Sequence, residues 1–370
     1  MPIVAGVDSS TQSVKVVLRD ADSGELVAST SRPHPDGSEV NPQHWWKALS
    51  EALDELSSHK ISAISIAGQQ HGMIALDKDG AVIRDALLWN DTRSDKAAED
   101  LNREIPDIAL RTGSQLVASF TASKVRWLAD SEKANANRVA AIALPHDWLS
   151  WKLSGAKSIE TLFTDRSDAS GTGYFDSRKN EYCLDILATA IRTNQEIILP
   201  KIIAPNQFGT TSTNSIPIAA GAGDNAGAAL GLGASLGDLV ISLGTSGTAF
   251  AISKSSTHDS SGEVAGFADA TGNFLPLACT LNAAKIFNTV AKSLSLSFEE
   301  FSSLALSAKV GAEGLRIIPH FDGERTPNKP SAKGSFYGIT HSNFTKENIA
   351  RASIEGVIAG MIYAAKAVER

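Results

Sequence analysis

The beginning of the chain alternates short apolar runs with polar turns. Each run is three to six residues of mostly aliphatic or β-branched side chains, and hydroxyl- or glycine-rich turns separate the first three. This pattern predicts a β-meander followed by a further strand. After Asn41-Pro42, tryptophan and leucine recur every three or four residues, which predicts a helix over 44–56. The predicted strands are 3–7, 14–18, 26–28 and 61–66.

A similar order of elements returns in the second half of the chain. Residues 238–243 and 248–252 predict two strands, joined by the turn Gly244-Thr245-Ser246-Gly247. Strand, small hydroxylated turn and strand therefore occur twice, and helical patterns follow each copy. We predict an α/β protein built from a duplicated unit, with domains at 1–234 and 235–370.

The last predicted element is an amphipathic helix over 347–370. Its apolar side chains recur with helical spacing, and no helix-stop residue follows them. We expect part of this face to be exposed, so that either solubility suffers or a partner chain covers it. A second copy of the chain, giving a homodimer, is one such partner. The expected face is Ile354, Val357, Ile358, Met361, Ile362, Ala365 and Val368.

Composition excludes several classes of protein. The 370 residues carry a formal charge of -7 without a long run of Lys or Arg, which argues against nucleic-acid or anionic-membrane binding. Cys183 and Cys279 are far apart and lack metal-ligand spacing, so neither a disulfide framework nor a structural zinc site is expected. The start of the chain lacks the basic region of a signal peptide. The most apolar long window, 216–236, is interrupted by Asp224 and rich in glycine, so it is not a membrane span. We expect a cytoplasmic protein.

One stretch, IAAGAGDNAGAALGLG at 218–233, carries a single carboxylate at the head of a small-residue helix. Asp224 is suited to cap that helix through its side-chain oxygen. Alternatively, the glycines before it allow a substrate to approach the backbone, so that the carboxylate accepts a proton from the substrate. Both interpretations stay open from this stretch alone.

Two turns rich in Ser and Thr, the second also containing Gly, lie on either side of Asp224 in the sequence, at 8–12 and 244–247. Backbone amides and small hydroxyls in such turns suit phosphate groups, and Lys15 adds a cation. Asp8, at the end of the first strand, is placed to hold Mg²⁺ through water. Each turn alone is also compatible with a plain hairpin. The sequence GxxxxGK[ST] is absent, as is GxGxxG in the opening unit, which favours a ribonuclease-H-like architecture over P-loop and dinucleotide folds.

Six motifs, in order along the whole chain, resemble those of the FGGY carbohydrate kinases. They are GVDSSTQSVK (6–15), AGQQHG (67–72), LWNDTR (88–93), GAGDNAGAALG (221–231), SLGTSGT (242–248) and GERTP (323–327). A family signature around Thr121, Lys124 and Trp127 is nearly met and fails at Ser131, where an amide or acid is expected. The resemblance implies two ribonuclease-H-like domains of the actin/hexokinase type with a cleft between them, and phosphoryl transfer from ATP with Mg²⁺.

The resemblance also implies roles for single residues. Asp224 resembles the general base, and Gln70 and His71 resemble the pair that contacts the ketopentose in members that phosphorylate D-xylulose. Without its flanking residues, His71 would be interpreted as a loop histidine bound to backbone groups. Trp89 is compatible with a wall of the sugar pocket or with the core. The remaining implied contacts are Asn225 for sugar, Asp8 for magnesium, and Thr11, Ser13, Gly244, Thr245 and Ser246 for the phosphates.

Family members continue past the helix at 347–370 into a glycine-rich loop that holds adenine. The resemblance therefore implies that the second domain is truncated here, and we expect the chain to bind sugar better than nucleotide. Three alternatives stay open: a kinase for another keto-sugar or polyol, a non-catalytic sugar-binding relative, and an actin-like or chaperone-like ATPase. The last has no reason to retain Gln70, His71 or Asp224.

Overall fold

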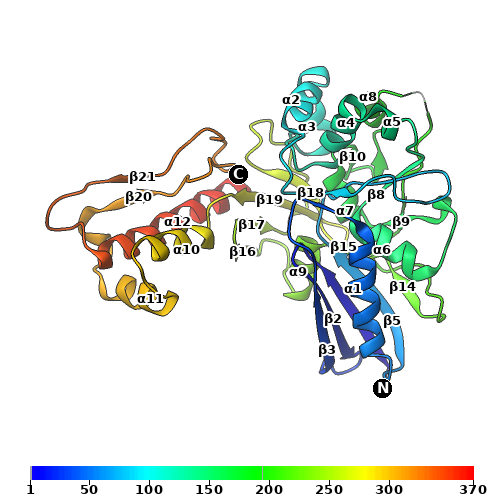
Figure 1. Cartoon of the computed structure of the whole chain (residues 1–370), viewed down its shortest axis with the longest axis horizontal. Coiled ribbons are helices and arrows are strands. Elements are labelled where there is room, and N and C mark those ends of the chain that lie inside the picture. The colour runs from blue at the N-terminus through cyan, green and yellow to red at the C-terminus, as the bar shows by residue number, and fades with distance from the viewer. Residues whose placement is uncertain (1, 194) are drawn as a thin grey trace. The chain divides into compact units, whose positions relative to one another are not determined.

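The computed structural model describes residues 2–193 and 195–370. By their contacts, these residues divide into two compact units (Figure 1). The first unit is Met1–Gly233 together with Phe267–Phe274, and the second is Ala234–Gly266 together with Leu275–Arg370. The segment Phe267–Phe274 joins the first unit because Ser170 Oγ accepts a hydrogen bond from the Ala268 amide at 3.0 Å.

The first unit is built on a mixed seven-stranded sheet with the order β13-β14-β5-β1-β2-β3, and β15 also pairs with β5. The predicted meander is confirmed, since β1, β2 and β3 are antiparallel neighbours. Strand β5 runs parallel to β1, and β14 and β15 each run parallel to β5. Their bounds are β1 Ile3–Ser9, β2 Ser13–Asp20, β3 Leu26–Pro33, β5 Ile61–Gly68, β13 Phe208–Thr211, β14 Pro217–Ala219 and β15 Ala222–Gly223.

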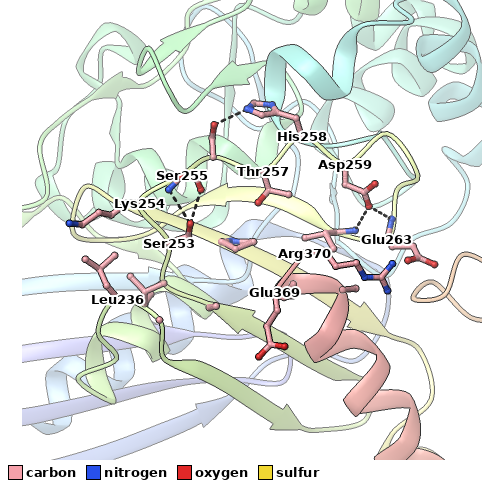
Figure 2. A pocket seen from close by; sticks show the side chains of 18 of the residues that line it. Leu236, Ser253, Lys254, Ser255, Thr257, His258, Asp259, Glu263, Glu369 and Arg370 are labelled. Carbon is pink, nitrogen blue, oxygen red and sulfur yellow. Dashed lines mark hydrogen bonds between the residues drawn. The ribbon is translucent and has the colours of Figure 1, made fainter.

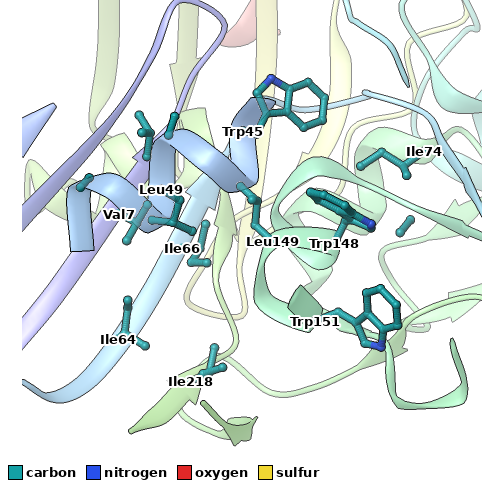
Figure 3. Close-up of a cluster of buried hydrophobic side chains, with 14 of the residues drawn as sticks. Val7, Trp45, Leu49, Ile64, Ile66, Ile74, Trp148, Leu149, Trp151 and Ile218 are labelled. Carbon is teal, nitrogen blue, oxygen red and sulfur yellow. The ribbon is translucent and has the colours of Figure 1, made fainter. Parts of the chain in front are cut away.

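Helix α1, Pro42–Glu55, packs against β2 and β3 of this sheet. It begins as predicted: the Asn41 side chain accepts a hydrogen bond from the Gln43 amide at 3.0 Å, and Pro42 occupies the first turn. Trp45 and Leu49 on its inner face are fully buried in the core of this unit (Figure 3). The strict alternation of β2 explains the packing, since its even-numbered apolar residues face this core.

Helices and short strands make up the rest of the first unit, and one of these helices is α8, Leu184–Ile191. The hydroxyl-rich stretch 158–173 contains the short helix α7, Arg166–Ala169. The other helices are α2 Asp95–Glu104, α3 Ile108–Thr112, α4 Thr121–Ser131, α5 Lys133–Ala136, α6 Pro145–Ser154 and α9 Asp224–Gly231. The short strands are β4 Glu39–Val40, β6 Ile74–Leu76, β7 Ala86–Leu87, β8 Ala141–Ala143, β9 Phe163–Thr164, β10 Phe175–Asp176, β11 Glu181–Tyr182 and β12 Lys201–Ile202.

The second unit contains a four-stranded sheet with the order β16-β17-β19-β18. The two strands predicted around the glycine turn are confirmed as the antiparallel pair β16 and β17. A cavity of about 980 Å³ lies between the serine-rich loop after β17 and the end of α12 (Figure 2). The elements are β16 Leu239–Leu243, β17 Gly247–Ala251, β18 Ala265–Ala268, β19 Phe274–Thr280, β20 Arg316–Ile318, β21 Ser335–Tyr337, α10 Ala284–Ser293, α11 Phe298–Ser307 and α12 Lys346–Val368.

The apolar face predicted for the last helix is divided between core and surface. Val357 and Met361 of α12 are buried, whereas Ile358 and Ile362 are 45% and 48% exposed. The helix packs on β17 and α11, and many of its buried residues are small, alanine above all. Small side chains permit close packing, so the buried stripe is turned away from the isoleucines. Among the described residues, no helix combines the length and the apolarity of a transmembrane segment.

Candidate functional site

The predicted sugar and base residues lie at one edge of the first unit's sheet. In the parallel register, Asp8 of β1 pairs with Ala67 of β5, which in turn pairs with Ala222 of β15. Residues that follow the three strands therefore emerge side by side at their carboxyl ends. Ligands of open α/β sheets bind at such edges. Asp8, Gln70 and Asp224 are thus brought together from three distant parts of the sequence.

Asp224 is the first residue of α9 rather than its cap. The N-cap position belongs to Gly223, and the Asp224 side chain makes no capping bond to the helix amides beyond its neighbour. Its Oδ1 accepts hydrogen bonds from the backbone amide of Asn225 at 2.7 Å and from Asn225 Nδ2 at 3.0 Å. Burial raises the pKa of Asp224 to about 6; the Asn225 amide lowers it and the charge of Asp8 adds to the rise. A carboxylate with this pKa is well matched to proton transfer near neutral pH.

Gln70 and His71 are held tightly at the end of β5. Gln70 Nε2 donates to the Ser167 carbonyl at 3.2 Å, and the Gln70 side chain lies against Gly223, just before Asp224. His71 has a left-handed backbone with φ of 70°. Its Nδ1 donates to the Gly171 carbonyl at 2.6 Å, since a carbonyl can only accept. The orientation of the imidazole ring is therefore fixed.

Two buried donors beneath His71 were not predicted. Lys124 Nζ and Thr121 Oγ1, both in α4, donate to the His71 carbonyl at 3.1 and 3.2 Å. Lys124 also donates to the Ser119 carbonyl. Burial lowers the pKa of Lys124 to about 7, and the charge of Asp91 opposes this shift. Both residues belong to the nearly complete family signature around residues 121–127. The sequence therefore singles them out, but it does not show that they bond to the His71 carbonyl.

The first hydroxyl-rich turn, between β1 and β2, is bonded to Trp89. Ser10 Oγ donates to Asp8 Oδ1 at 2.6 Å, and Lys15 stands directly opposite Asp8 in the β1–β2 register. Trp89 Nε1 donates to Thr11 Oγ1 at 2.9 Å, and the Trp89 ring is half-buried rather than part of the core. Asp8 and Lys15 are exposed, and Ser13 opens β2.

The second turn belongs to the second unit. It joins β16 to β17, and the Gly244 amide donates to the Ser246 carbonyl at 3.1 Å. Gly244 and Thr245 are exposed, so their backbone groups can meet a ligand. The amide of Ala284, at the start of α10, donates to the Gly244 carbonyl at 3.0 Å and anchors the turn from behind. None of the predicted site residues lines the cavity in Figure 2.

The chain belongs to the FGGY family of carbohydrate kinases. The family's N-terminal domain model matches residues 3–231 and its C-terminal domain model matches residues 239–370. The predicted α/β fold of two actin/hexokinase-type domains is confirmed, and the C-terminal domain model matches residues of the second domain. Kinases of this family use ATP with Mg²⁺.

Several relatives carry a more specific name. A xylulose kinase of Streptomyces coelicolor is 41% identical over 98% of this chain and 75% of its own length. A xylulose kinase of Escherichia coli is 33% identical over 95% of this chain and 76% of its own length. The crystal structure of xylulose kinase from Bifidobacterium adolescentis superposes with a TM-score of 0.91 at 41% identity, covering 100% of this chain and 82% of that one.

Proposed function

We propose that this protein transfers the γ-phosphoryl group of MgATP to D-xylulose, giving D-xylulose 5-phosphate and ADP. The observation that carries the proposal is the carboxylate of Asp224, which has a pKa near neutrality and stands at the same strand edge as Gln70 and His71. The 41% identity to named xylulose kinases supports the choice of sugar. An enzyme that consumes ATP and a free sugar is proposed to work in the cytoplasm as a homodimer, without nucleic acid as a partner.

In this proposal Asp224 accepts the proton of the attacking sugar hydroxyl. As that proton leaves, the hydroxyl oxygen forms a bond to the γ-phosphorus and the bond to the ADP oxygen breaks. Asn225 orients Asp224 through its two hydrogen bonds and contacts the sugar. Gln70 and His71 bind sugar hydroxyls, and Trp89 forms one wall of the pocket. The chemistry requires positioning rather than a covalent intermediate.

The phosphates are assigned to the two hydroxylated turns. The phosphate contacts proposed for the first turn are Thr11, Ser13 and Lys15. Those proposed for the second turn are Gly244, Thr245 and Ser246. The exposed carboxylate of Asp8, with Ser10 bound to one oxygen, fits Mg²⁺, which prefers one or two carboxylates and keeps several waters. When bound, Mg²⁺ neutralises charge that develops on the phosphates.

The proposal is tested by measuring ADP release from the purified chain with ATP alone and with a panel of sugars. D-xylulose should stimulate release far more than D-ribulose, gluconate or glycerol. Stimulation by another sugar alone would identify a different kinase of this family. No stimulation, with sugar binding retained in calorimetry, would indicate a non-catalytic sugar-binding protein.

We expect His71→Asn to weaken xylulose binding about 10- to 100-fold and to leave ATP binding within about twofold, because the ring is held beside the sugar residues by polar contacts. Asparagine tolerates the left-handed backbone, so the change removes the ring without straining the chain. Calorimetry with each ligand separately measures both constants. Equal losses for the two ligands would show that His71 is structural.

We expect Lys124→Met to raise the KM for xylulose about tenfold, because the His71 carbonyl loses its lysine donor while the volume of the buried side chain is kept. The KM for ATP should not change. Lys47→Met, which alters a lysine that is 75% exposed, is the matched control. Steady-state kinetics with each substrate varied in turn decides the matter, and a parallel rise in both KM values would contradict the expectation.

A further inference from the structure

His146, the second residue of α6, is a fully buried histidine with both ring nitrogens engaged. Its Nε2 lies 3.2 Å from the Ala220 carbonyl oxygen, and its Nδ1 lies 2.6 Å from Asp168 Oδ2. A carbonyl oxygen can only accept, so Nε2 carries a hydrogen and donates it. A second proton is shared between Nδ1 and the Asp168 carboxylate. The ring therefore joins α7 to the residue four positions before Asp224.

The surroundings of His146 favour a protonated ring. Asp147 Oδ1 lies 3.2 Å from Nδ1, and Asp165 Oδ1 lies 3.9 Å from Nε2. Burial by itself lowers the pKa of His146, but the carboxylates of Asp147 and Asp168 outweigh it and raise the pKa to about 10. His146, Asp147 and Asp168 are also close enough to suggest a metal site. However, two ligand atoms of one ion are usually about 3 Å apart or more, and both ring nitrogens here are taken by hydrogen bonds.

Two glycines, Gly221 and Gly68, let the backbone pass close to His146. Gly221 has φ of 83°, and a Cβ at this position would lie 2.4 Å from Cδ2 of His146. A Cβ on Gly68, at the end of β5, would lie 3.0 Å from Cβ of His146. Glycine at both positions lets α6 approach the strand ends closely. The turn that leads to Asp224 thus lies directly on the imidazole.

A second anchor holds the far end of the same turn. The Gly223 amide donates to Ser167 Oγ at 3.0 Å, and Asp165 caps α7 by accepting from the amides of Ser167 and Asp168. Ser167 also accepts from Gln70 through its carbonyl. Helix α7 is therefore a common support for the sugar residue Gln70 and for the turn at 220–223. His146 is the bond between that support and the start of the turn.

We propose that His146 is a positioning residue that fixes the turn at 220–223 and, through it, the direction of the Asp224 carboxylate. The proposal rests on the role of Asp224 as general base in the proposed kinase reaction. It predicts that loss of the bond to Ala220 lowers the rate of phosphoryl transfer without a matching loss of sugar affinity. If His146 only stabilised the fold, its loss would not lower the rate of phosphoryl transfer while leaving sugar affinity unchanged.

His146→Gln and His146→Asn both replace the protonated imidazole by a neutral amide. They differ in which hydrogen bond of His146 the amide can still make. The amide of His146→Gln reaches where Nε2 lies and keeps the bond to Ala220, whereas that of His146→Asn reaches only where Nδ1 lies. We expect His146→Asn to lower kcat about 10- to 100-fold and the KM for xylulose to change less than about threefold. His146→Gln should stay within about fivefold of the wild-type kcat. Equal kcat losses in both variants would overturn the proposal.

Two further measurements complete the test. In an Asp224→Asn background, His146→Asn should cause no additional loss of kcat, because residues that act as a unit are not additive. A multiplicative loss would indicate a separate, structural role. Hydrogen exchange of the peptide 218–226 needs no substrate and should be faster in His146→Asn than in His146→Gln. Unchanged exchange would refute the proposal, whereas an inactive wild type with the expected exchange pattern would refute only the proposed reaction.

Discussion

Asp224→Asn is expected to lower kcat with xylulose by about 100- to 10,000-fold, the usual cost of losing a general base. The substitution keeps the size of the side chain, and its amide oxygen can still accept the two hydrogen bonds from Asn225. Only the ability to take up a proton is removed. Since Asp224 is a half-buried carboxylate with a raised pKa, its replacement by a neutral amide should not lower the melting temperature.

Single-turnover ADP formation and thermal unfolding of the same preparation test both parts of this expectation. Calorimetry with xylulose shows whether the sugar still binds. An Asp224→Asn protein that is folded, binds xylulose and retains more than about a tenth of the wild-type kcat would exclude Asp224 as the base. Asn225→Asp is an informative comparison, because it disturbs the partner of Asp224 and leaves the base in place.

Much of the fold could be predicted because local patterns decide it. Strand β1 is a short apolar run, β2 alternates strictly, and α1 has a cap, a proline and an apolar stripe that agree with one another. The candidate base, Asp224, could be found for a similar reason. A lone carboxylate between glycines and a small-residue helix is a local signal, and the parallel register then places it beside Asp8.

The supports of the site could not be predicted, because they depend on long-range contacts. Lys124 bonds to a carbonyl 53 positions earlier in the chain, and His146 bonds to one 74 positions later. A lysine at a helix position is normally interpreted as exposed, yet Lys124 is fully buried. The stretch around Ser167 lacks a helical or strand period, so its sequence does not predict the helix α7. Its high content of Asp, Ser and Thr was the only signal that it served a site.

The helix α12 shows a different limit. Its isoleucines recur with helical spacing, and periodicity therefore assigns them to the same apolar face as Val357 and Met361. Packing instead follows the side with the most alanine, where the helix contacts β17 and α11, so Ile358 and Ile362 remain half exposed. Spacing identifies a helix and its period, but the choice between two apolar sides depends on how closely each can approach its neighbours.

Asp8→Asn is expected to lower kcat by about 100- to 1,000-fold, the usual effect of removing one electrostatic contact to a reacting group. Asparagine preserves the size of the side chain and can still accept the bond from Ser10, so the turn should stay intact. Because the lost charge is assigned to Mg²⁺, the Mg²⁺ concentration for half-maximal activity should rise. Kinetics over a range of Mg²⁺ at fixed ATP measures this, and Lys15→Met serves to separate the loss of a metal ligand from a general disturbance of the turn.

The same Asp8 variant should also shift the pH dependence of catalysis. Asp224 must be deprotonated to act as a base, so wild-type kcat/KM should fall as the pH drops below about 6, the pKa of Asp224. Burial is the main cause of that raised pKa, the Asn225 amide opposes it, and the negative charge of Asp8 adds to it. Removing the Asp8 charge makes the carboxylate of Asp224 easier to form, so in Asp8→Asn the acidic fall in kcat/KM should move to lower pH. A fall that stays in place would mean that a group other than Asp224 controls it, and a shift to higher pH would contradict the proximity of the two carboxylates.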